Sequence, residues 1–547
     1  MPLKFKENRP HAVGTYFMYV RAFYSLKFKE NYRIFVMRKL SMILALTLLC
    51  GSFSCTKAQQ PTQQVLTVNR YAQPKREFRG AWMQCVNGMY LGKTSQQIRD
   101  MLTSQLDVLQ RANINAILFQ VRPEGDALYR SNIEPWSRYL TGQQGLPPAD
   151  GWDPLQWMIE QCHARGMECH AWINPYRMKT KNTTQLAASH LAIQHPEWVI
   201  QYGDLLILNP ALEVARLHTC VVVEDILRHY DVDGIHMDDY FYPYPEGGME
   251  FNDKEYYDRD PRGFNTLADW RRDNVNMLVR DLHNLIREVK PWVKFGISPF
   301  GIYRNDKSGQ NTAYDSATNG LQNYDDLYAD VLKWEQEGWV DYLIPQVYWN
   351  FGTKAADYGI LLNWWNDNCK NRPVFIGQDV ERTVKGQDLN DPTRHQMDAK
   401  YRLQRQLPNI QGSCQWYAAA VASNPGNYAT ILEKVYHPYP ALQPAMPFID
   451  NNPPKAPKKL KVKLQNGITV LSWKKDKFRK EMNKAISYVI YDFPPNEIID
   501  LENPAAIRAI TRNTSVALQG DFYGHTILVT ALDHLHNESL PAILKLE

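Results

Sequence analysis

Eight short apolar stretches between residues 78 and 419 alternate with longer amphipathic stretches, and this alternation constrains the fold most strongly. Each apolar stretch has the length and composition of a buried strand. Strands that alternate with helices over this length predict an α/β fold, a (β/α)8 barrel of the TIM type with enlarged loops. The expected strands are FRGAWMQ (78–84), NAILFQVRP (115–123), ECHAWINPY (168–176), DGIHMDDY (233–240), KFGISPFG (294–301), DYLIPQVYW (341–349), PVFIGQD (373–379) and SCQWYAA (413–419).

The segments between these strands carry a helical pattern. Apolar residues recur there at helical spacing, and Gly166 supplies a stop signal after one of the segments. The expected helices are 95–113, 153–166, 217–230, 274–290 and 324–338. A doubly wound open sheet is the structural alternative. Such a sheet usually has a glycine-rich phosphate turn after its first strand, and AWMQCVNGMY contains none.

The character of the sequence changes near residue 445, where the barrel expected over 76–445 ends. A linker over 446–459 contains the Pro- and Lys-rich stretch NNPPKAPKK. Residues 460–547 then alternate between apolar and polar positions, with turns between the runs. This pattern predicts a small all-β sandwich.

The C-terminal part also resembles a fibronectin type III domain. The resemblance rests on Trp473, Tyr488, Tyr491 and the stretch VTALDHLHNES (529–539), which lie where such domains carry them. It covers this tail alone, and it implies a sandwich of that type behind the barrel.

The N-terminal part predicts export. MRKLSMILALTLLCGSFSC starts at Met37 with two basic residues, continues with an apolar run from Leu40 to Leu49, and ends in small residues. This is the layout of a signal peptide over 37–54, and its apolar run is too short to cross a membrane. SFSC resembles a bacterial lipobox, in which Cys55 is lipidated and anchors the protein to a membrane.

Two alternatives for this terminus are cleavage by an ordinary signal peptidase without lipidation, and lipidation at Cys50. A signal peptide works poorly when 36 residues precede it, so Met37 is the expected start and residues 1–36 are expected to be unstructured. The polar, Gln-rich residues 55–75 are expected to form a tether. The protein is thus expected in the cell envelope, in the periplasm or at the outer membrane.

Charge and cysteine content narrow the classes further. The net charge is +4, but residues 1–54 carry nine Lys/Arg and two Glu, so the rest of the chain carries about −3, and nothing in this balance calls for a nucleic-acid partner. Six cysteines outside the N-terminal segments are scattered without paired spacing, which predicts small buried side chains and no disulfide framework. We expect no metal and no cofactor. These cysteines are Cys85, Cys162, Cys169, Cys220, Cys369 and Cys414.

Polar side chains recur where the expected strands end. In a barrel of this type the active site lies at the C-terminal ends of the strands. Side chains alternate along a strand, so if Ile235 and Met237 face the helices, His236 and Asp238 face inward. The same parity predicts a polar pocket that also includes Gln120, Arg122, His170, Trp172, Asn174, Ser298, Gln346, Tyr348 and Asp379.

The composition of this pocket favours carbohydrate chemistry. The sequence has no nucleophilic Ser in a glycine elbow, no HExxH and no phosphate loop. Carboxylates suit glycosidic cleavage, amides and Arg bind hydroxyl groups, and aromatic rings stack on sugars. Asp238 is the expected nucleophile or base because it ends a strand at mid-barrel. The adjacent Asp239 is expected to point elsewhere and to orient a loop or an arginine.

The sequence does not fix the second carboxylate of a glycosidase pair. The candidates are Glu124 and Asp126 in VRPEGDALY, and Asp379 and Glu381 in GQDVER. His236 either donates a hydrogen bond near Asp238 or packs below it.

The loop that follows the fourth strand, through residue 261, is expected to form one wall of a sugar groove. Its aromatic side chains can stack on sugar rings or pin the loop to the barrel, and a mixture of both is expected. They are Tyr240, Phe241, Tyr242 and Tyr244.

Six motifs resemble the bacterial glycosyl-hydrolase-like 10 family of exported lipoproteins, in order, from about residue 76 to 440. They are EFRGAWM (77–83), FQVRPEGDALY (119–129), HAWINPYR (170–177), VDGIHMDDYFYP (232–243), FGISPFGIYR (295–304) and DYLIPQVYW (341–349). The resemblance implies a TIM-type barrel and a hydrolase acting on polysaccharide at the cell envelope, and some relatives are associated with the glycan strands of peptidoglycan.

Carried over by residue, the resemblance supports Asp238, Arg122, Asn174 and Gln346 as pocket residues. Some relatives have an acid at the position of Asn174. If that acid is their proton donor, this protein uses another donor or cleaves differently.

The sequence therefore predicts an exported lipoprotein glycoside hydrolase. The main alternative is a glycan-binding lipoprotein without catalysis. An envelope structural protein is a third reading, but it leaves the polar strand ends unexplained. Carboxylates at glycosidase separation would favour the enzyme, whereas an aromatic platform without them would favour binding.

Overall fold

The computed structural model describes residues 73–183, 185–306, 314–465, 468–475 and 480–547. The predictions for residues 1–36, the signal peptide, Cys55 and the tether up to residue 72 lie outside the described residues. Within the described part of the chain, no helix is both long and apolar enough to span a membrane.

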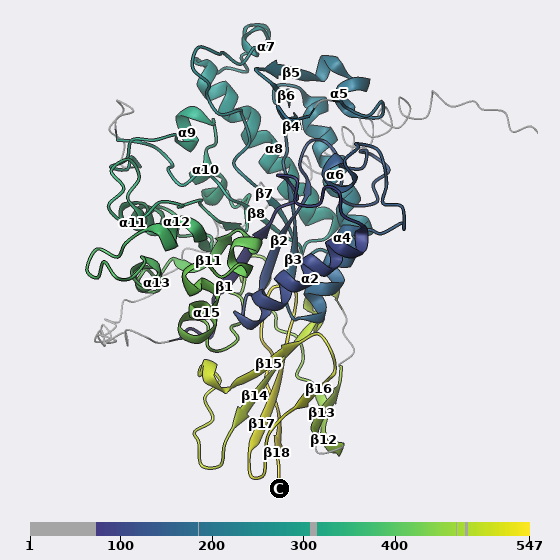
Figure 1. The fold of residues 1–547 in the computed structure, drawn as a ribbon, viewed down its shortest axis with the longest axis vertical. Coiled ribbons are helices and arrows are strands. Elements are labelled where there is room, and N and C mark those ends of the chain that lie inside the picture. The colour runs from purple at the N-terminus through teal and green to yellow at the C-terminus, as the bar shows by residue number, and fades with distance from the viewer. Residues whose placement is uncertain (1–72, 184, 307–313, 466–467, 476–479) are drawn as a thin grey trace, which may run out of the picture. The chain divides into compact units, whose positions relative to one another are not determined.

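Eight parallel strands close into a barrel, as the alternating pattern predicts (Figure 1). Around the barrel the order is β1-β11-β10-β9-β8-β7-β3-β2. The last strand pairs with the first, with Phe78 opposite Gly412, which excludes the open-sheet alternative. The strands are β1 (Phe78–Met83), β2 (Ala116–Arg122), β3 (Glu168–Ile173), β7 (Gly234–Met237), β8 (Lys294–Ile297), β9 (Tyr342–Leu343), β10 (Val374–Asp379) and β11 (Ile410–Trp416).

Helices cover the outside of the barrel between consecutive strands (Figure 1). The first of them begins with a capping box, in which Thr94 and Gln97 each accept the other's backbone N–H. The longer helices are α2 (Ser95–Arg111), α4 (Pro154–Ala164), α6 (Glu213–His229), α8 (Leu267–Val289), α11 (Tyr358–Asn368) and α13 (Met397–Gln406). The shorter ones are α3 (Arg138–Thr141), α5 (Leu191–Gln194), α7 (Lys254–Arg259), α9 (Asn323–Asp326), α10 (Val331–Gln336), α12 (Val380–Lys385), α14 (Ala418–Ala422) and α15 (Tyr428–Ile431).

Side chains fill the interior of the barrel. Phe78 of β1 stacks on Phe375 of β10, with 4.1 Å between the ring centroids, and Tyr342 of β9 joins the same buried cluster. Cys414 of β11 also belongs to this cluster, and all six cysteines outside the N-terminal segments are buried and free, as predicted. The barrel is therefore a packed core, as in other barrels of this type.

Gly296 of β8 leaves the space that the ring of Tyr342 fills. A Cβ atom added at this position would lie 1.9 Å from a ring carbon of Tyr342. We expect Gly296→Ala to lower the free energy of unfolding by ~1–3 kcal/mol, the usual cost of overpacking a core. Urea denaturation measures this change, with Gly247→Ala as control because its added Cβ meets nothing within 4 Å. Equal midpoints for the two variants would contradict the packing described.

A small antiparallel sheet with the order β4-β6-β5 follows β3 at the mouth of the barrel. Its strands are β4 (Arg177–Lys179), β5 (Val199–Tyr202) and β6 (Leu205–Leu208). The sequence analysis did not predict this sheet because its strands are only three or four residues long, too short for a pattern to stand out.

The C-terminal residues form the predicted sandwich of two antiparallel sheets. Trp473 and Leu518 from one sheet pack against Tyr488, Ile490 and Val529 from the other. The first sheet contains β12 (Lys458–Gln465), β13 (Ile468–Lys474) and β16 (Ser515–Leu518). The second contains β15 (Ile507–Thr511), β14 (Ser487–Phe493), β17 (Thr526–Leu532) and β18 (Ala542–Lys545).

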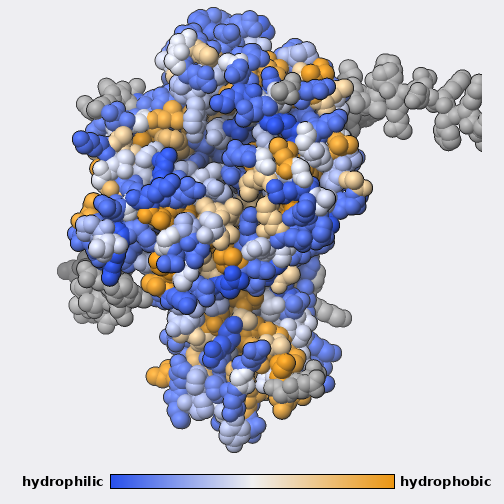
Figure 2. Space-filling view, in the orientation of Figure 1, coloured by the Kyte–Doolittle hydropathy of each residue, from blue (hydrophilic) through white to orange (hydrophobic). Residues whose placement is uncertain are grey.

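The sandwich is packed against the barrel and also exposes apolar side chains. Met446, the first residue of the expected linker, is buried in the barrel cluster. On the outside, Leu464 and Ile543 of the sandwich strands are exposed. Figure 2 shows hydrophobic residues among hydrophilic ones on the surfaces of both the sandwich and the barrel.

Candidate active site

Strand β7 delivers Asp238 to the C-terminal mouth of the barrel, where the carboxyl group is 3% exposed. Its Oδ2 accepts hydrogen bonds from Trp172 Nε1, at 2.9 Å, and from Asn174 Nδ2. Both donors come from the end of the neighbouring strand β3. Within the described residues, Oδ1 receives only the backbone N–H of Tyr240, at 3.4 Å. One oxygen of Asp238 is thus fixed, and the other has no strong donor.

Gln120 of β2 orients the amide that holds Asp238. Its Nε2 donates to Asn174 Oδ1 at 3.1 Å, and its Oε1 accepts the backbone N–H of Cys85 at 3.2 Å. Because the oxygen of Asn174 is occupied in this way, its amide nitrogen faces Asp238. Gln120 therefore acts on the carboxyl group through Asn174.

The environment of Asp238 favours its protonated form. Burial raises its pKa to about 7, and the nearby charge of Asp239 adds to this rise. The guanidinium of Arg177 and the hydrogen bond from Trp172 oppose it. A carboxyl group with this pKa can hold and release a proton near neutral pH.

Asp239 turns toward the loop after β7 and toward β9. Its Oδ1 accepts from Gln346 Nε2 at 2.9 Å, and its Oδ2 accepts from the hydroxyl of Tyr244. Burial raises the pKa of Asp239, while these two donors favour its ionised form. Asp239 therefore remains in the mouth beside Asp238, and it anchors the loop.

Aromatic rings surround the two carboxyl groups. Trp416 lies 6.1 Å from Trp82, 6.2 Å from Trp172 and 6.0 Å from Tyr348, measured between ring centroids. Tyr348 and Trp416 are partly exposed, so ring surface is available at the mouth. Aromatic faces of this kind suit the apolar faces of sugar rings.

The aromatic side chains of the loop after β7 divide into two pairs. Phe241 and Tyr242 are each 1% exposed and pin the loop to the barrel. Tyr240 and Tyr244 are partly exposed and stack on each other, with 5.4 Å between ring centroids. The pinning role thus holds for Phe241 and Tyr242, and stacking of Tyr240 and Tyr244 on sugar rings stays a prediction.

A cavity of about 280 Å³ lies along this loop, next to the small sheet. Arg177 faces it from β4, with its guanidinium carbon 3.8 Å from the centre of the Tyr240 ring. The cavity is lined by Arg177, Thr180, Leu205, Ile207, Tyr240, Phe241, Tyr242, Pro243, Tyr244 and Glu246.

Glu124 and Asp126 are held inside a hydrogen-bonded network. Glu124 is 1% exposed and accepts from Arg138, Thr180 and Thr183, with Arg138 Nε at 3.1 Å. Burial favours the neutral form of Glu124, but these donors lower its pKa below the ordinary value. Burial and the charge of Glu124 raise the pKa of Asp126 to about 7, and its oxygens accept from Gln144 and the Glu124 backbone. Both acids hold the loop after β2 in place.

Asp379 lies at the end of β10, on the same side of the strand as Phe375 and Gly377, which face the barrel interior. Its Oδ1 caps α12 by accepting the backbone N–H of Arg382 at 2.8 Å. Asp379 is partly exposed, and its charge, like that of Asp239, acts on Tyr348. Glu381 is exposed and pairs with Lys385, 3.5 Å away.

Several residues expected in the pocket lie below the mouth. Arg122 is fully buried and forms a bidentate pair with Glu134, at 2.6 and 2.8 Å. His170 and His236 are also fully buried, and Ser298 is 1% exposed. His236 packs beneath Asp238 and bonds to Ser298 Oγ at 3.1 Å. In this structure these four residues support the mouth and do not line it.

Among the described residues, no group of three or more His, Cys, Asp or Glu side chains is placed to hold a metal ion.

Comparison with known proteins gives the family. Residues 77–395 match the model of the Glycosyl hydrolase-like 10 family. The chain belongs to this family. It is similar to Glycosyl hydrolase YngK of Bacillus subtilis (strain 168), with 38% identity over 485 residues, which cover 86% of this chain and 93% of that protein. It is also similar to Glycosyl hydrolase DigH of Escherichia coli (strain K12), with 33% identity over 370 residues, covering 62% of this chain and 82% of the relative.

The Glycosyl hydrolase-like 10 match includes Asp238, Asp239 and Asp379, whereas Trp416 and the sandwich lie beyond its end. Three mouth residues were missed in the sequence. Strand parity, applied to FRGAWM and SCQWYAA, would have placed Trp82 and Trp416 inward. Arg177 gave no such signal because the small sheet that carries it was not predicted.

Proposed function

We propose that this member of the Glycosyl hydrolase-like 10 family is a glycoside hydrolase with Asp238 as its proton donor and Asp239 as the partner carboxylate. One observation carries the proposal. Two adjacent carboxyl groups are buried at the end of β7, both have a raised pKa, and aromatic rings surround them. The names of the relatives support the same reaction class.

Cleavage of a glycosidic bond needs a proton at the bridging oxygen and negative charge near the anomeric carbon. Asp238 supplies the proton from Oδ1, because Oδ2 is held by Trp172 and Asn174. As the proton moves to the bridging oxygen, the carbon–oxygen bond breaks and the leaving sugar departs as an alcohol.

The second half of the reaction restores the site. The carboxylate of Asp239, held by Tyr244 and Gln346, faces the positive charge at the anomeric carbon. A water molecule adds to that carbon and gives one proton to Asp238. The raised pKa makes Asp238 a proton donor in this scheme, in place of the nucleophile or base expected from its position on the strand.

The proposed role of Asp238 fixes the alkaline side of the pH profile. The active form is protonated, and burial places its pKa at about 7. As far as Asp238 sets the rate, we therefore expect kcat/KM to be constant at pH values below this pKa. Above it, kcat/KM should fall about tenfold per pH unit. Initial rates of reducing-end release from pH 5 to 9 measure the profile. A rate that rises through pH 7 would contradict proton donation by Asp238.

The proposed substrate is a polysaccharide of the cell envelope, and the glycan strands of peptidoglycan are one candidate. This finer proposal rests on the predicted export signal and on the motifs shared with the family. The same features support a lipid anchor at Cys55 and a location in the periplasm or at the outer membrane. The resemblance of the sandwich to a fibronectin type III domain stays a prediction.

A panel of glycans tests the proposal. The full chain is incubated with envelope polysaccharides, including peptidoglycan strands with and without stem peptides, and new reducing ends are counted. Release by the wild type and by Glu381→Gln, which changes an exposed acid at the rim, supports a hydrolase. Saturable binding without any release would instead make the protein a glycan-binding lipoprotein.

A further inference from the structure

A column of buried polar side chains runs along the axis of the barrel below the mouth. Glu168 begins β3, and its Oε2 lies 2.9 Å from Nε2 of His170. Nδ1 of His170 lies 2.7 Å from the hydroxyl of Tyr342, which lies 3.1 Å from Nδ1 of His236. Nε2 of His236 then meets Ser298 Oγ at 3.1 Å and Trp82 Nε1 at 3.3 Å. Four strands of the barrel, β1, β3, β7 and β9, contribute to this column of hydrogen bonds, and Ser298 follows a fifth, β8.

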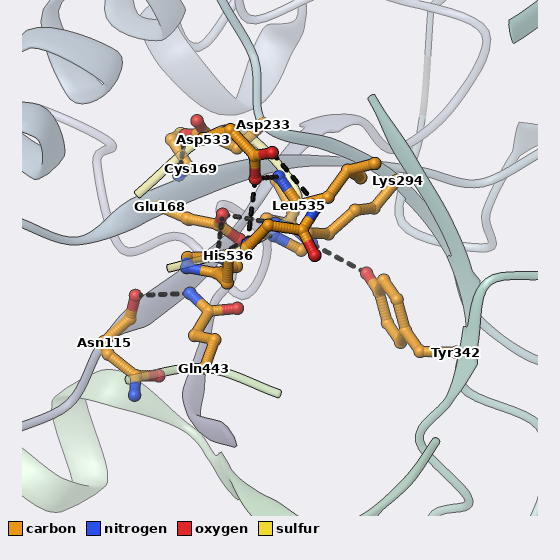
Figure 3. Close-up of polar contacts among 12 residues, drawn as sticks. Asn115, Glu168, Cys169, Asp233, Lys294, Tyr342, Gln443, Asp533, Leu535 and His536 are labelled. Carbon is orange, nitrogen blue, oxygen red and sulfur yellow. Dashed lines mark hydrogen bonds and ion pairs between the residues drawn. The ribbon is translucent and has the colours of Figure 1, made fainter. Parts of the chain in front are cut away.

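The C-terminal sandwich closes the lower end of this column of hydrogen bonds. The loop between β17 and β18 enters the barrel there, and Leu535 is fully buried in the barrel cluster. Nε2 of His536 lies 2.7 Å from Oε1 of Glu168, and Lys294 pairs with the same oxygen. Figure 3 shows Glu168, Lys294, Leu535 and His536 gathered at this point. A residue of the sandwich thus fixes the first carboxylate of the barrel chain.

The loop that carries His536 is itself rigidly held. Asp533 accepts the backbone N–H groups of Leu535 and Asn537, both at 2.9 Å. Arg76, just before β1, donates to the carbonyl of His536 at 3.0 Å. The position of His536 is therefore set by both the sandwich and the barrel.

The direction of each hydrogen bond in the column follows from the charge of Glu168 at its lower end. The charges of Lys294 and His536 outweigh burial and keep the pKa of Glu168 well below its ordinary value, so Glu168 only accepts hydrogen bonds. A ring of His170 that carries one proton then donates it from Nε2 and accepts at Nδ1. The Tyr342 hydroxyl donates to that Nδ1, and its oxygen accepts from Nδ1 of His236.

The contacts at the upper end of the column independently require the same hydrogen-bond directions. The indole N–H of Trp82 can only donate, so Nε2 of His236 is an acceptor. Burial lowers the pKa of His236 well below its ordinary value, which leaves the ring neutral with its single proton on Nδ1. Both ends of the chain therefore select one tautomer for each histidine.

Ser298 and Trp82 connect this column of hydrogen bonds to the proposed catalytic groups. Gln346 donates to the carbonyl of Ser298 and to Oδ1 of Asp239, each at 2.9 Å. The ring of Trp82 contacts Trp416 in the aromatic wall. The layer directly under Asp238 and Asp239 thus rests on His236, Ser298 and Trp82.

We propose that the sandwich is a working part of the active site: His536 is a positioning residue that holds Glu168, and Glu168 fixes the tautomers of His170 and His236 beneath the mouth. The effect on catalysis rests on the proposed function. The tautomers themselves do not, and they can be measured without any substrate.

Nitrogen NMR of the full chain with labelled histidine tests the proposal. The ring signals are assigned with His170→Gln and His236→Gln. We expect His236 to be protonated at Nδ1 and His170 at Nε2, each with a slowly exchanging N–H. His536→Ala should broaden or remove these N–H signals, and His536→Gln should retain them because its amide can donate to Glu168. A proton on Nε2 of His236, or signals unchanged in His536→Ala, would overturn the proposal.

Arg512→Gln separates this effect from a general loosening of the interface. Arg512 of the sandwich pairs with Asp233 at 2.6 Å, and among the described residues no hydrogen bond joins Arg512 to a side chain of the column. We expect this variant to keep both histidine signals. Equal losses in Arg512→Gln and His536→Ala would reduce His536 to an ordinary interface contact and overturn its positioning role.

Kinetics then connect the chain to the site. With a glycan that the wild type cleaves, His536→Ala should lower kcat about tenfold, roughly the effect of one hydrogen bond, with KM unchanged. His536→Gln should restore most of the loss. A wild type that cleaves no glycan would refute the proposed function and leave the tautomer result standing. Normal kcat in His536→Ala, with the wild type active, would refute the coupling.

Discussion

Replacing Asp238 with asparagine is expected to lower kcat/KM for glycan cleavage by roughly 10²- to 10⁴-fold, the usual contribution of general acid catalysis. Asparagine has the same shape, and its side-chain oxygen can still accept from Trp172 and Asn174. The folded mouth is therefore retained, while the proton for the leaving oxygen is lost. Rates of reducing-end release by the two proteins measure the change.

The choice of substrate shows which role Asp238 has. An aryl glycoside with an acidic phenol as leaving group needs little protonation, so Asp238→Asn should lose much less activity on it than on a glycan. Glu381→Gln is the control and should match the wild type on both substrates. Equal and severe losses on both substrates would indicate that Asp238 is the nucleophile and would contradict its role as proton donor.

The same substitution is expected to stabilise the protein at alkaline pH. The pKa of Asp238 is 3.8 as a free side chain and about 7 in the fold. At pH values between 3.8 and 7 the folded state keeps a proton on Asp238 that the unfolded state has released. The contribution of Asp238 to the free energy of unfolding is therefore fully present below pH 3.8 and is lost as the pH rises to 7. Asparagine cannot ionise, and Asp238→Asn should gain on the order of a few kcal/mol relative to the wild type at pH 8 and little at pH 4.

Urea denaturation at the two pH values measures this gain. Glu124→Gln is the informative comparison, because the hydrogen bonds from Arg138 and Thr180 lower the pKa of Glu124 despite its burial. Its ionised form contributes stability above its unfolded pKa, so this variant should be less stable than the wild type at pH 8. If Asp238→Asn were also destabilised at pH 8, the raised pKa of Asp238 would be wrong.

The barrel could be predicted because each strand leaves a local pattern. In β7, the apolar residues Ile235 and Met237 already indicate that His236 and Asp238 face inward, and the structure has them so. The same parity places Gln120, Asn174 and Gln346 inside the barrel. Local alternation is sufficient for such statements because a strand has only two faces.

The roles of individual acids could not be predicted because their partners are distant in the sequence. Glu124 is saturated by Thr180 and Thr183, more than fifty residues away along the chain. Asp239 remains in the mouth because Gln346, 107 residues later, and the nearby Tyr244 hold it there. The hydrogen bond between His536 and Glu168 joins residues that are 368 positions apart, so the sequence gives no local signal for it.

The most direct measurement of the central claim is the origin of the oxygen at the new reducing end. A glycan is digested in water enriched in oxygen-18, and the products are analysed by mass spectrometry. Hydrolysis with Asp238 as proton donor should leave one heavy oxygen on each new reducing end with the wild type, and almost no product with Asp238→Asn. Products without the heavy oxygen, or equal product with both proteins, would contradict hydrolysis centred on Asp238.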